Sequence, residues 1–224
     1  MARAKLPRKS TAVDMTAMCD VAFLLLAFFI LATKFKPPEA LSVNTPSSVS
    51  TKIAPDKDVV MVTIDKAGKV YFSISESNRT EEGEILDAIN TAKNLGITDA
   101  EKKAFMNIPN AYIGVPFSQL KAFLTKTPEE LKHVALAGIP VLDSNANEMN
   151  DWFRAAKEAF QGKQMNVLVK GDDASKYPSF GGVIDALKKN DIMKFQIVTN
   201  PVAVPLGTDL YKTNMATGKK GAAD

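Results

Sequence analysis

Apolar residues form one unbroken run near the N-terminus and are spaced periodically along the rest of the chain. The run covers residues 21–32 and lies within residues 15–33, a 19-residue segment with a single charged side chain. A helix of 19 residues is about 28 Å long, close to the thickness of the hydrocarbon core of a bilayer. Pro37 and Pro38 end any helix that begins there. We therefore predict one transmembrane helix, over residues 15–35.

After the apolar run, the pattern predicts short strands and amphipathic helices. Alternation of apolar and polar residues indicates half-buried strands, and a spacing of three or four residues indicates helices. The helix near residue 80 is expected to begin at Thr80, and Pro178 suits the first turn of a later helix. Strand–helix–strand units of this kind pack around one sheet. The expected strands are residues 59–65, 70–74, 165–170 and 195–199, and the two helices are 80–92 and 178–189.

These elements predict a chain of five parts. A linker rich in Pro, Ser and Thr is expected to be extended rather than packed, and the C-terminal tail is expected to be flexible. The parts are a cytoplasmic N-terminus (1–14), the transmembrane helix (15–35), a periplasmic linker (36–57), a small α+β domain (58–200) and the tail (201–224).

Charge and rare residues exclude several classes of function. The net charge is only +3, and no basic stripe is interleaved with aromatic residues, so a nucleic-acid-binding protein is not expected. Cys19 is the only cysteine and His133 the only histidine, so no metal-ligand cluster and no nucleophile–base pair is evident. We expect neither an enzyme nor a metal site. No thiol follows the predicted membrane segment, which suits an oxidising compartment such as a periplasm.

The flanking charges predict the orientation of the helix. Four basic residues lie within the first nine positions, which places the N-terminus in the cytoplasm and residues 40–224 outside. Two other interpretations are a cleaved signal peptide and a buried core helix. The stretch before Lys34 has no convincing cleavage site, and a signal peptide has no use for an acidic residue at position 20.

Asp20 is the candidate functional residue. An ionised Asp at the centre of a membrane helix costs roughly 2.5–3.5 kcal/mol, and burial favours the neutral form of a carboxyl group, so Asp20 could exchange a proton. Thr16 and Ala27 share its helical face; the hydroxyl could bond the carboxyl group, and the small Ala27 would admit another helix. Asp14 suits a helix cap. The alternative is an Asp20 that extends to the interface and has no role.

The residues around Asp20 resemble the ExbD/TolR family of biopolymer-transport proteins. That family has a short basic start, a polar residue–x–Thr–Pro–x–x–Asp entry and a leucine-rich membrane helix. Asp14, Thr16 and Asp20 match the polar positions, while Ala17 stands where the family usually has proline. The predicted hairpin and the closing strand–helix–strand unit are similar to the family's periplasmic domain. Residues 95–162 depart from it and imply a mostly helical insertion.

The resemblance implies a proton-motive-force-driven motor subunit in the bacterial inner membrane. Asp20 would then carry protons, with the proton as coupling ion and no other cofactor. The implied partners are membrane lipid, a second copy of the chain, an ExbB-like multi-pass oligomer that encloses the dimer, and a TonB-like protein that is energised for outer-membrane uptake.

Two other functions stay open. A TolR-like subunit that maintains the envelope would share the same chemistry and differ only in its output. A membrane-tethered periplasmic binding module would use its helix as a passive anchor. The binding-module interpretation predicts that function is preserved when the membrane helix is replaced by an anchor without a carboxyl group.

Overall fold

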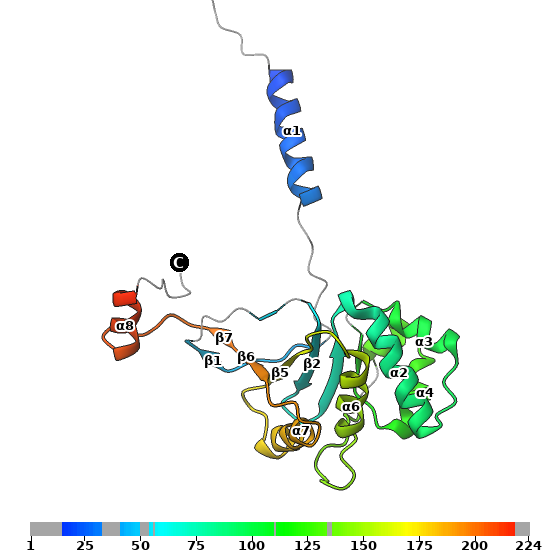
Figure 1. Ribbon diagram of the computed structural model, residues 1–224. Coiled ribbons are helices and arrows are strands. Elements are labelled where there is room, and N and C mark those ends of the chain that lie inside the picture. Colours follow the sequence, from blue (N-terminus) through cyan, green and yellow to red (C-terminus); the bar gives the residue numbers. More distant parts are fainter. Residues whose placement is uncertain are drawn as a thin grey trace, which may run out of the picture. The chain divides into compact units, whose positions relative to one another are not determined.

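The computed structural model describes residues 15–32, 41–49, 54–55, 57–109, 111–133 and 136–217 (Figure 1). The chain divides into two compact units, residues 1–38 and 39–224. The elements in chain order are α1 (Met15–Ala32), β1 (Ser47–Ser48), β2 (Val59–Ile64), β3 (Val70–Ile74), the 3-10 helix η1 (Glu76–Asn78), α2 (Arg79–Lys93), α3 (Asp99–Met106), β4 (Tyr112–Ile113), α4 (Phe117–Leu124), α5 (Pro128–His133), α6 (Met149–Ala159), β5 (Asn166–Gly171), α7 (Tyr177–Lys189), β6 (Phe195–Val198), β7 (Asn200–Pro201) and α8 (Asp209–Thr217).

The second unit is built on a five-stranded mixed sheet with the strand order β4-β3-β2-β5-β6. β2 pairs antiparallel with β3, as the predicted hairpin requires. It also pairs parallel with β5, and β5 pairs parallel with β6 through the crossover helix α7. Each of the four predicted strands is present, with ends shifted by one residue at most. The α+β interpretation of the domain is therefore confirmed.

The turn of the β2–β3 hairpin is fixed by its own residues. One carboxylate oxygen of Asp65 accepts hydrogen bonds from the backbone amides of Ala67 and Lys69, each at 2.8 Å. Gly68 has a φ of 79°, a left-handed conformation that favours glycine. The hydroxyl of Ser179, in the first turn of α7, donates to the Gly68 carbonyl at 2.6 Å. The start of the crossover helix is thereby attached to the hairpin.

Helices α2, α6 and α7 cover one face of the sheet, with α6 in contact with both neighbours (Figure 1). The Trp152 ring of α6 stacks on Phe72 of β3 with centroids 5.1 Å apart, and Phe153 meets Phe72 edge-on at 6.5 Å. The aromatic side chains of α6 are part of the core, because Trp152 and Phe153 are fully buried. Within residues 95–162, α6 packs on α2 and α7, and α3 packs on α2 and α4. Buried side chains of α3, α4 and α6 all belong to the main hydrophobic core.

The predicted N-cap of α2, Thr80, is wrong by two residues. The helix begins at Arg79, so Thr80 lies inside it and makes no capping box. The N-cap is Asn78, which follows directly from η1 and is held in place by Asp58. By contrast, Thr98 forms a complete capping box with Glu101 at the start of α3.

Both segments that flank the domain contain more structure than predicted. Within the linker, β1 pairs parallel with β7, with Ser47 opposite Asn200 and Ser48 opposite Pro201. Residues 41–49 are extended, as expected, but they are packed against the domain rather than free. An extended chain keeps its backbone donors and acceptors available, so it can pair with another strand. Linker residues 36–40, 50–53 and 56 lie outside the described residues. The predicted flexible tail contains α8 up to residue 217, and residues 218–224 are also outside the described part.

Candidate functional site

Helix α1 exposes its apolar side chains around its whole circumference. Among the residues that the structure describes, it is the one helix whose length and composition suit a membrane span. A core helix of a water-soluble protein can share that composition, but no residue of α1 is buried. Phe23 is 66% exposed and Leu31 is 86% exposed. The described residues thus give the buried-core interpretation no support, and an apolar helix with no buried side chain requires lipid or another protein surface.

Asp20 is the only charged residue in α1 and is exposed. Thr16 lies one turn before it and Ala27 two turns after it, so the three share one side of the helix, as predicted. Ala27 is the only half-buried residue of α1, whose other residues are exposed. Asp14 falls outside the described residues, so its capping role stays a prediction.

The composition of α1 determines what Asp20 can do alone. The 18 residues include no lysine, arginine or histidine, so the helix carries no counter-ion for the carboxylate. In lipid, the ionised form would therefore require a polar or hydrated surface from another helix, whereas the protonated form is neutral. A lone helix in lipid would give this side chain no route to water, so any such route would have to come from neighbouring helices.

The linker joins the domain beyond the end of β5. The backbone amide of Asn44 donates to Oδ2 of Asp172 at 3.1 Å, and the amide of Asp173 donates to the Asn44 carbonyl at 2.8 Å. The Asn200 side chain donates to the carbonyl of Thr45 at 3.1 Å, and Thr45 is buried. Residues 44–48 are thus attached to the domain before the chain enters β2.

A second attachment lies where the chain enters β2. The Asn78 side chain donates to the Asp58 carboxylate at 2.8 Å and accepts from the Asp58 amide at 3.1 Å. The amide of Asn166, at the start of β5, donates to the Asp58 carbonyl at 2.7 Å. Beside this group, Lys163 pairs with the buried Glu81, and its hydrogen bond holds the pKa of Glu81 below the ordinary value.

Neither attachment was predicted from the sequence. Asp172 was interpreted as part of a solvated turn, and it does accept from the amide of Ala174 within that turn. Its second oxygen holds Asn44, which is 128 residues away. No local pattern reports a contact between residues so distant in the chain.

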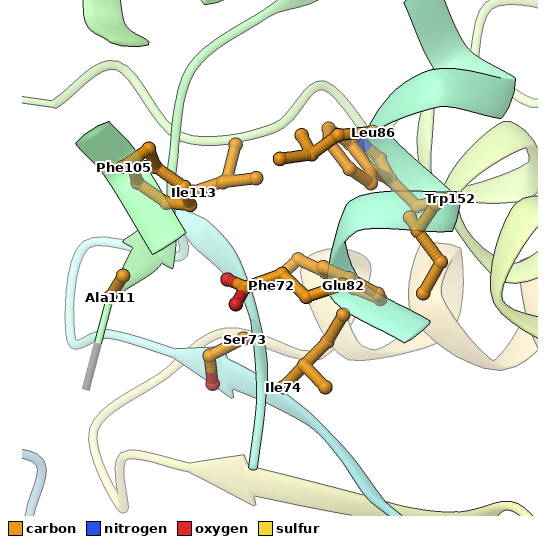
Figure 2. A pocket seen from close by; sticks show the side chains of 10 residues that line it. Phe72, Ser73, Ile74, Glu82, Leu86, Phe105, Ala111, Ile113 and Trp152 are labelled. Atoms are coloured by element: carbon orange, nitrogen blue, oxygen red, sulfur yellow. The ribbon is translucent and has the colours of Figure 1, made fainter. Parts of the chain in front are cut away.

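A small pocket lies between α2, the end of α3 and the strands β3 and β4 (Figure 2). Most of its walls are apolar, and the exceptions are Ser73 and the carboxyl group of Glu82. Burial in this environment raises the pKa of Glu82 to about 7, and the opposing charge of Arg79 offsets only part of the effect. The apolar lining residues are Phe72, Ile74, Ile85, Leu86, Phe105, Ala111, Ile113 and Trp152.

The described residues contain no group of three or more His, Cys, Asp and Glu side chains that could hold a metal ion. Gly181 and Gly182, which might suggest a phosphate-binding loop, lie within α7. A Cβ atom at Gly182 would be 2.2 Å from the carbonyl oxygen of Val141, so this glycine permits close packing. The structural interpretation of Gly182 is confirmed.

One comparison with known proteins gave a match. The family model described as "Biopolymer transport protein ExbD/TolR" matches residues 7–202. The match includes all of α1 with Asp20, and the domain as far as β7. It therefore confirms the resemblance seen in the residues around Asp20. No curated protein and no solved structure matched the chain.

Proposed function

Because the chain belongs to the ExbD/TolR family of biopolymer transport proteins, we propose that it is a proton-driven motor subunit of the bacterial inner membrane. A role in biopolymer transport follows from the family. The proton-driven mechanism rests on one observation, which is that Asp20 is the single charge of an apolar helix with no buried residue. A passive anchor gains nothing from a residue that is costly to place in lipid.

The proton route requires partner helices, since one helix in lipid gives Asp20 no contact with water. We propose that a dimer of this chain lies inside an ExbB-like multi-pass oligomer, with Ala27 at a close helix contact and Thr16 near the carboxyl group. Small residues let helix backbones approach closely in membranes. Polar or hydrated sites on the oligomer would receive the ionised Asp20, and its apolar wall would admit only the protonated form.

Alternation between those two forms would convert proton flow into movement of α1. A protonated Asp20 can pass an apolar surface, and the loss of its proton on the other side prevents its return. A membrane potential contributes about 2.3 kcal/mol per charge per 100 mV, which is several times the thermal energy and is enough to bias each step.

The movement would reach the periplasmic domain through the linker. Ala32 ends α1 and Asn44 is the first residue with a hydrogen bond to the far end of the chain, so twelve residue steps separate helix and attachment. At full extension twelve steps span roughly 40 Å. With the N-terminus in the cytoplasm, the domain would then engage a TonB-like protein that powers outer-membrane uptake.

Substitution of Asp20 tests the proposal. Asp20→Asn keeps the size of the side chain and removes its charge and its exchangeable carboxyl proton. Co-purified with its multi-pass partner and reconstituted in liposomes with a pH-sensitive dye, this variant should assemble normally and conduct no protons above the level of the partner alone. Asp185→Asn, the same change at an exposed position of α7, is the control and should conduct like the wild type. Wild-type conduction by Asp20→Asn would contradict the proposal.

The family match covers ExbD and TolR alike, so the output of the motor needs a separate test. A deletion strain that loses uptake of iron chelates supports the TonB-type output, and a leaky outer membrane supports a TolR-like role. Replacement of α1 with an apolar helix that has no carboxyl group distinguishes both from a tethered binding module, because only such a module would keep its function.

A further inference from the structure

Glu82 is the only charged residue among the described residues that line the pocket between α2, α3, β3 and β4. Its side chain extends from α2 into the pocket, toward β3 and β4 (Figure 2). The residue is half-buried, so the pocket is open to solvent. Its space is about 220 Å³ with the mouth included, less than the roughly 300–1,000 Å³ of sites for drug-sized ligands. The pocket therefore suits a small group, and its inner part has room for one about the size of a water molecule.

The charge of Glu82 has no partner in the described part of the chain. Its neighbour Glu81 is paired with Lys163, whereas no cation in that part lies within ion-pair distance of Glu82. Arg79, one turn earlier on α2, acts on Glu82 through its charge without forming an ion pair. A carboxylate among apolar side chains is costly without a counter-ion, and a cation that enters the pocket would lower that cost. The pocket therefore favours a cationic ligand.

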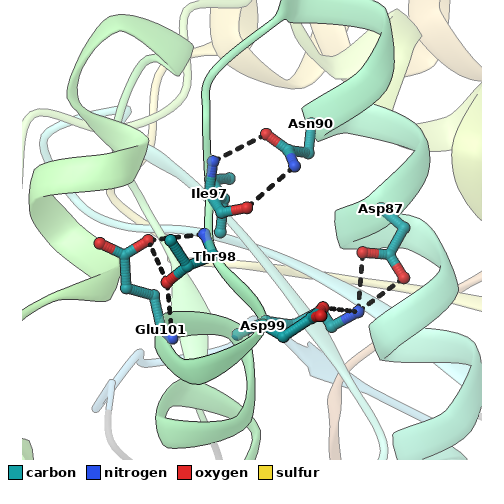
Figure 3. Close-up of polar contacts among 7 residues, drawn as sticks. Asp87, Asn90, Ile97, Thr98, Asp99 and Glu101 are labelled. Carbon is teal, nitrogen blue, oxygen red and sulfur yellow. Dashed lines mark hydrogen bonds and ion pairs between the residues drawn. The ribbon is translucent and has the colours of Figure 1, made fainter.

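The wall that α3 supplies is held on α2 by polar contacts. The Nζ atom of Lys102 donates to both carboxylate oxygens of Asp87 at 2.7 Å (Figure 3). The Asn90 side chain donates to the Ile97 carbonyl at 3.1 Å and accepts from the Ile97 amide at 2.9 Å. These contacts fix the start of α3, and Phe105 of the same helix lines the pocket. The wall is thus in place before any ligand binds, and Lys102 is engaged with an acid outside the pocket.

Aromatic rings make up much of the remaining lining. Phe72 and Trp152 stack with their centroids 5.1 Å apart, and both line the pocket together with Phe105. The faces of aromatic rings attract cations, and the attraction grows where water is displaced. A cation in this pocket would therefore meet one carboxylate and several rings.

We propose that this pocket binds a primary ammonium group on an alkyl stem, with Glu82 as its counter-ion. A lysine side chain of a partner protein and a free alkylamine both carry that group. A primary ammonium is about as small as a water molecule and fits the inner part of the pocket, whereas a guanidinium group is larger. The alkyl stem lies along the apolar walls, as lysine stems do on other apolar surfaces.

The test titrates the full chain with n-butylamine in phosphatidylcholine liposomes, which contain no other protein. Trp152, the only tryptophan in the chain, lines the pocket and reports on its occupancy. At pH 8, above the pKa of about 7 of Glu82, the amine should change the Trp152 emission with a saturable dependence on concentration. At the same concentrations 1-butanol should not, because it has the same stem without the charge. Calorimetric titration of the same samples detects binding that leaves the emission unchanged.

Matched variants identify the counter-ion. Glu82→Gln removes the charge with little change of shape and should weaken binding of n-butylamine about tenfold or more, because a hydrogen bond to a charged group is stronger than one to a neutral group. Glu84→Gln, the same change at an exposed position of α2, should bind like the wild type.

Two further ligands define the group and its source. n-Butylguanidine should bind the wild type more weakly than n-butylamine, because its head is larger. Lysine blocked at both backbone ends has the same ammonium group on the same four-carbon stem. If it binds as tightly as n-butylamine, the mouth admits a lysine of a partner protein; if it binds more weakly, a free amine is the ligand.

The proposal is wrong if n-butylamine gives neither a saturable emission change nor heat of binding, if 1-butanol binds equally well, or if Glu82→Gln binds n-butylamine like the wild type. None of these outcomes bears on Asp20, so the ammonium site and the motor function can fail independently.

Discussion

Asp20 and Glu82 both carry a carboxyl group among apolar side chains. They differ in which part of the molecule, or which partner, forms the environment of that group. Glu82 lies in a pocket that its own domain builds from β3, β4 and three helices. Asp20 lies on a helix that has no buried residue. The domain by itself supplies the surroundings of Glu82, whereas under the proposed function lipid and partner helices supply those of Asp20.

This difference also separates the two parts of the chain in function. The folded domain has its own hydrophobic core and is expected to fold without a partner. Under the proposed function, helix α1 supplies one carboxyl group and needs partner helices to form a proton route. Such a motor subunit would bring that carboxyl group to a channel that another protein builds, and its folded domain would receive the movement.

The largest predicted effect concerns the independence of the domain. Trp152→Ala removes a fully buried ring that stacks on Phe72, and such substitutions cost about 3–5 kcal/mol. Urea unfolding of the full chain in nanodiscs, followed by far-ultraviolet circular dichroism, should show this loss for the domain transition. The matched change on α1, Phe23→Ala, should leave that transition where it is. A similar loss in both variants would mean that the two parts fold as one.

The next prediction concerns the stability cost of Glu82. Its pKa is raised from the ordinary 4.5 to about 7 in the folded state, so the folded protein holds this proton more tightly than the unfolded chain does. The free energy of unfolding of the wild type should therefore fall by at most about 3 kcal/mol as the pH rises from 4.5 to 7, and it should change no further above pH 7. In urea titrations, Glu82→Gln should therefore be more stable than the wild type at pH 8, and this advantage should vanish near pH 4. An advantage that is the same at both pH values would exclude burial of the charge as its cause.

The smallest predicted effect concerns the attachment of the linker. Asp172→Ala removes the acceptor for the Asn44 amide, a charge-assisted hydrogen bond at a partly exposed site, and should weaken the docking of residues 44–48 by about 1 kcal/mol. Hydrogen exchange at the Asn44 amide should then be about fivefold faster. Asp173→Ala, which changes an exposed neighbour whose backbone makes the contact, should leave the exchange rate unchanged.

The sequence predicted those features that depend on local pattern. The four strands, the hairpin of β2 and β3 and the helix α7 with Pro178 in its first turn each follow from residues within a few positions of one another. The apolar run and its single Asp20 were visible for the same reason.

The features that were missed depend on contacts between distant residues. Asn44 meets Asp172 across 128 positions, and no pattern in one sequence reports such a pair. α2 begins before Thr80 because Asp58, 20 residues earlier, fixes Asn78. The pocket around Glu82 forms only when α2, α3, β3 and β4 are in place. In the sequence Glu82 is only the second residue after the predicted cap Thr80, so nothing indicated that it would be partly buried.

The central claim is that Asp20 gains and loses a proton at lipid depth, and chemical labelling tests it most directly. Lipid-soluble dicyclohexylcarbodiimide modifies carboxyl groups in their protonated form. In membranes that hold the assembled complex, mass spectrometry should find Asp20 modified, less so as the pH rises, and the modification should stop proton flux. The claim would be contradicted if only a water-soluble carbodiimide modified Asp20 and the proton flux stayed unchanged afterwards, because the side chain would then lie in water.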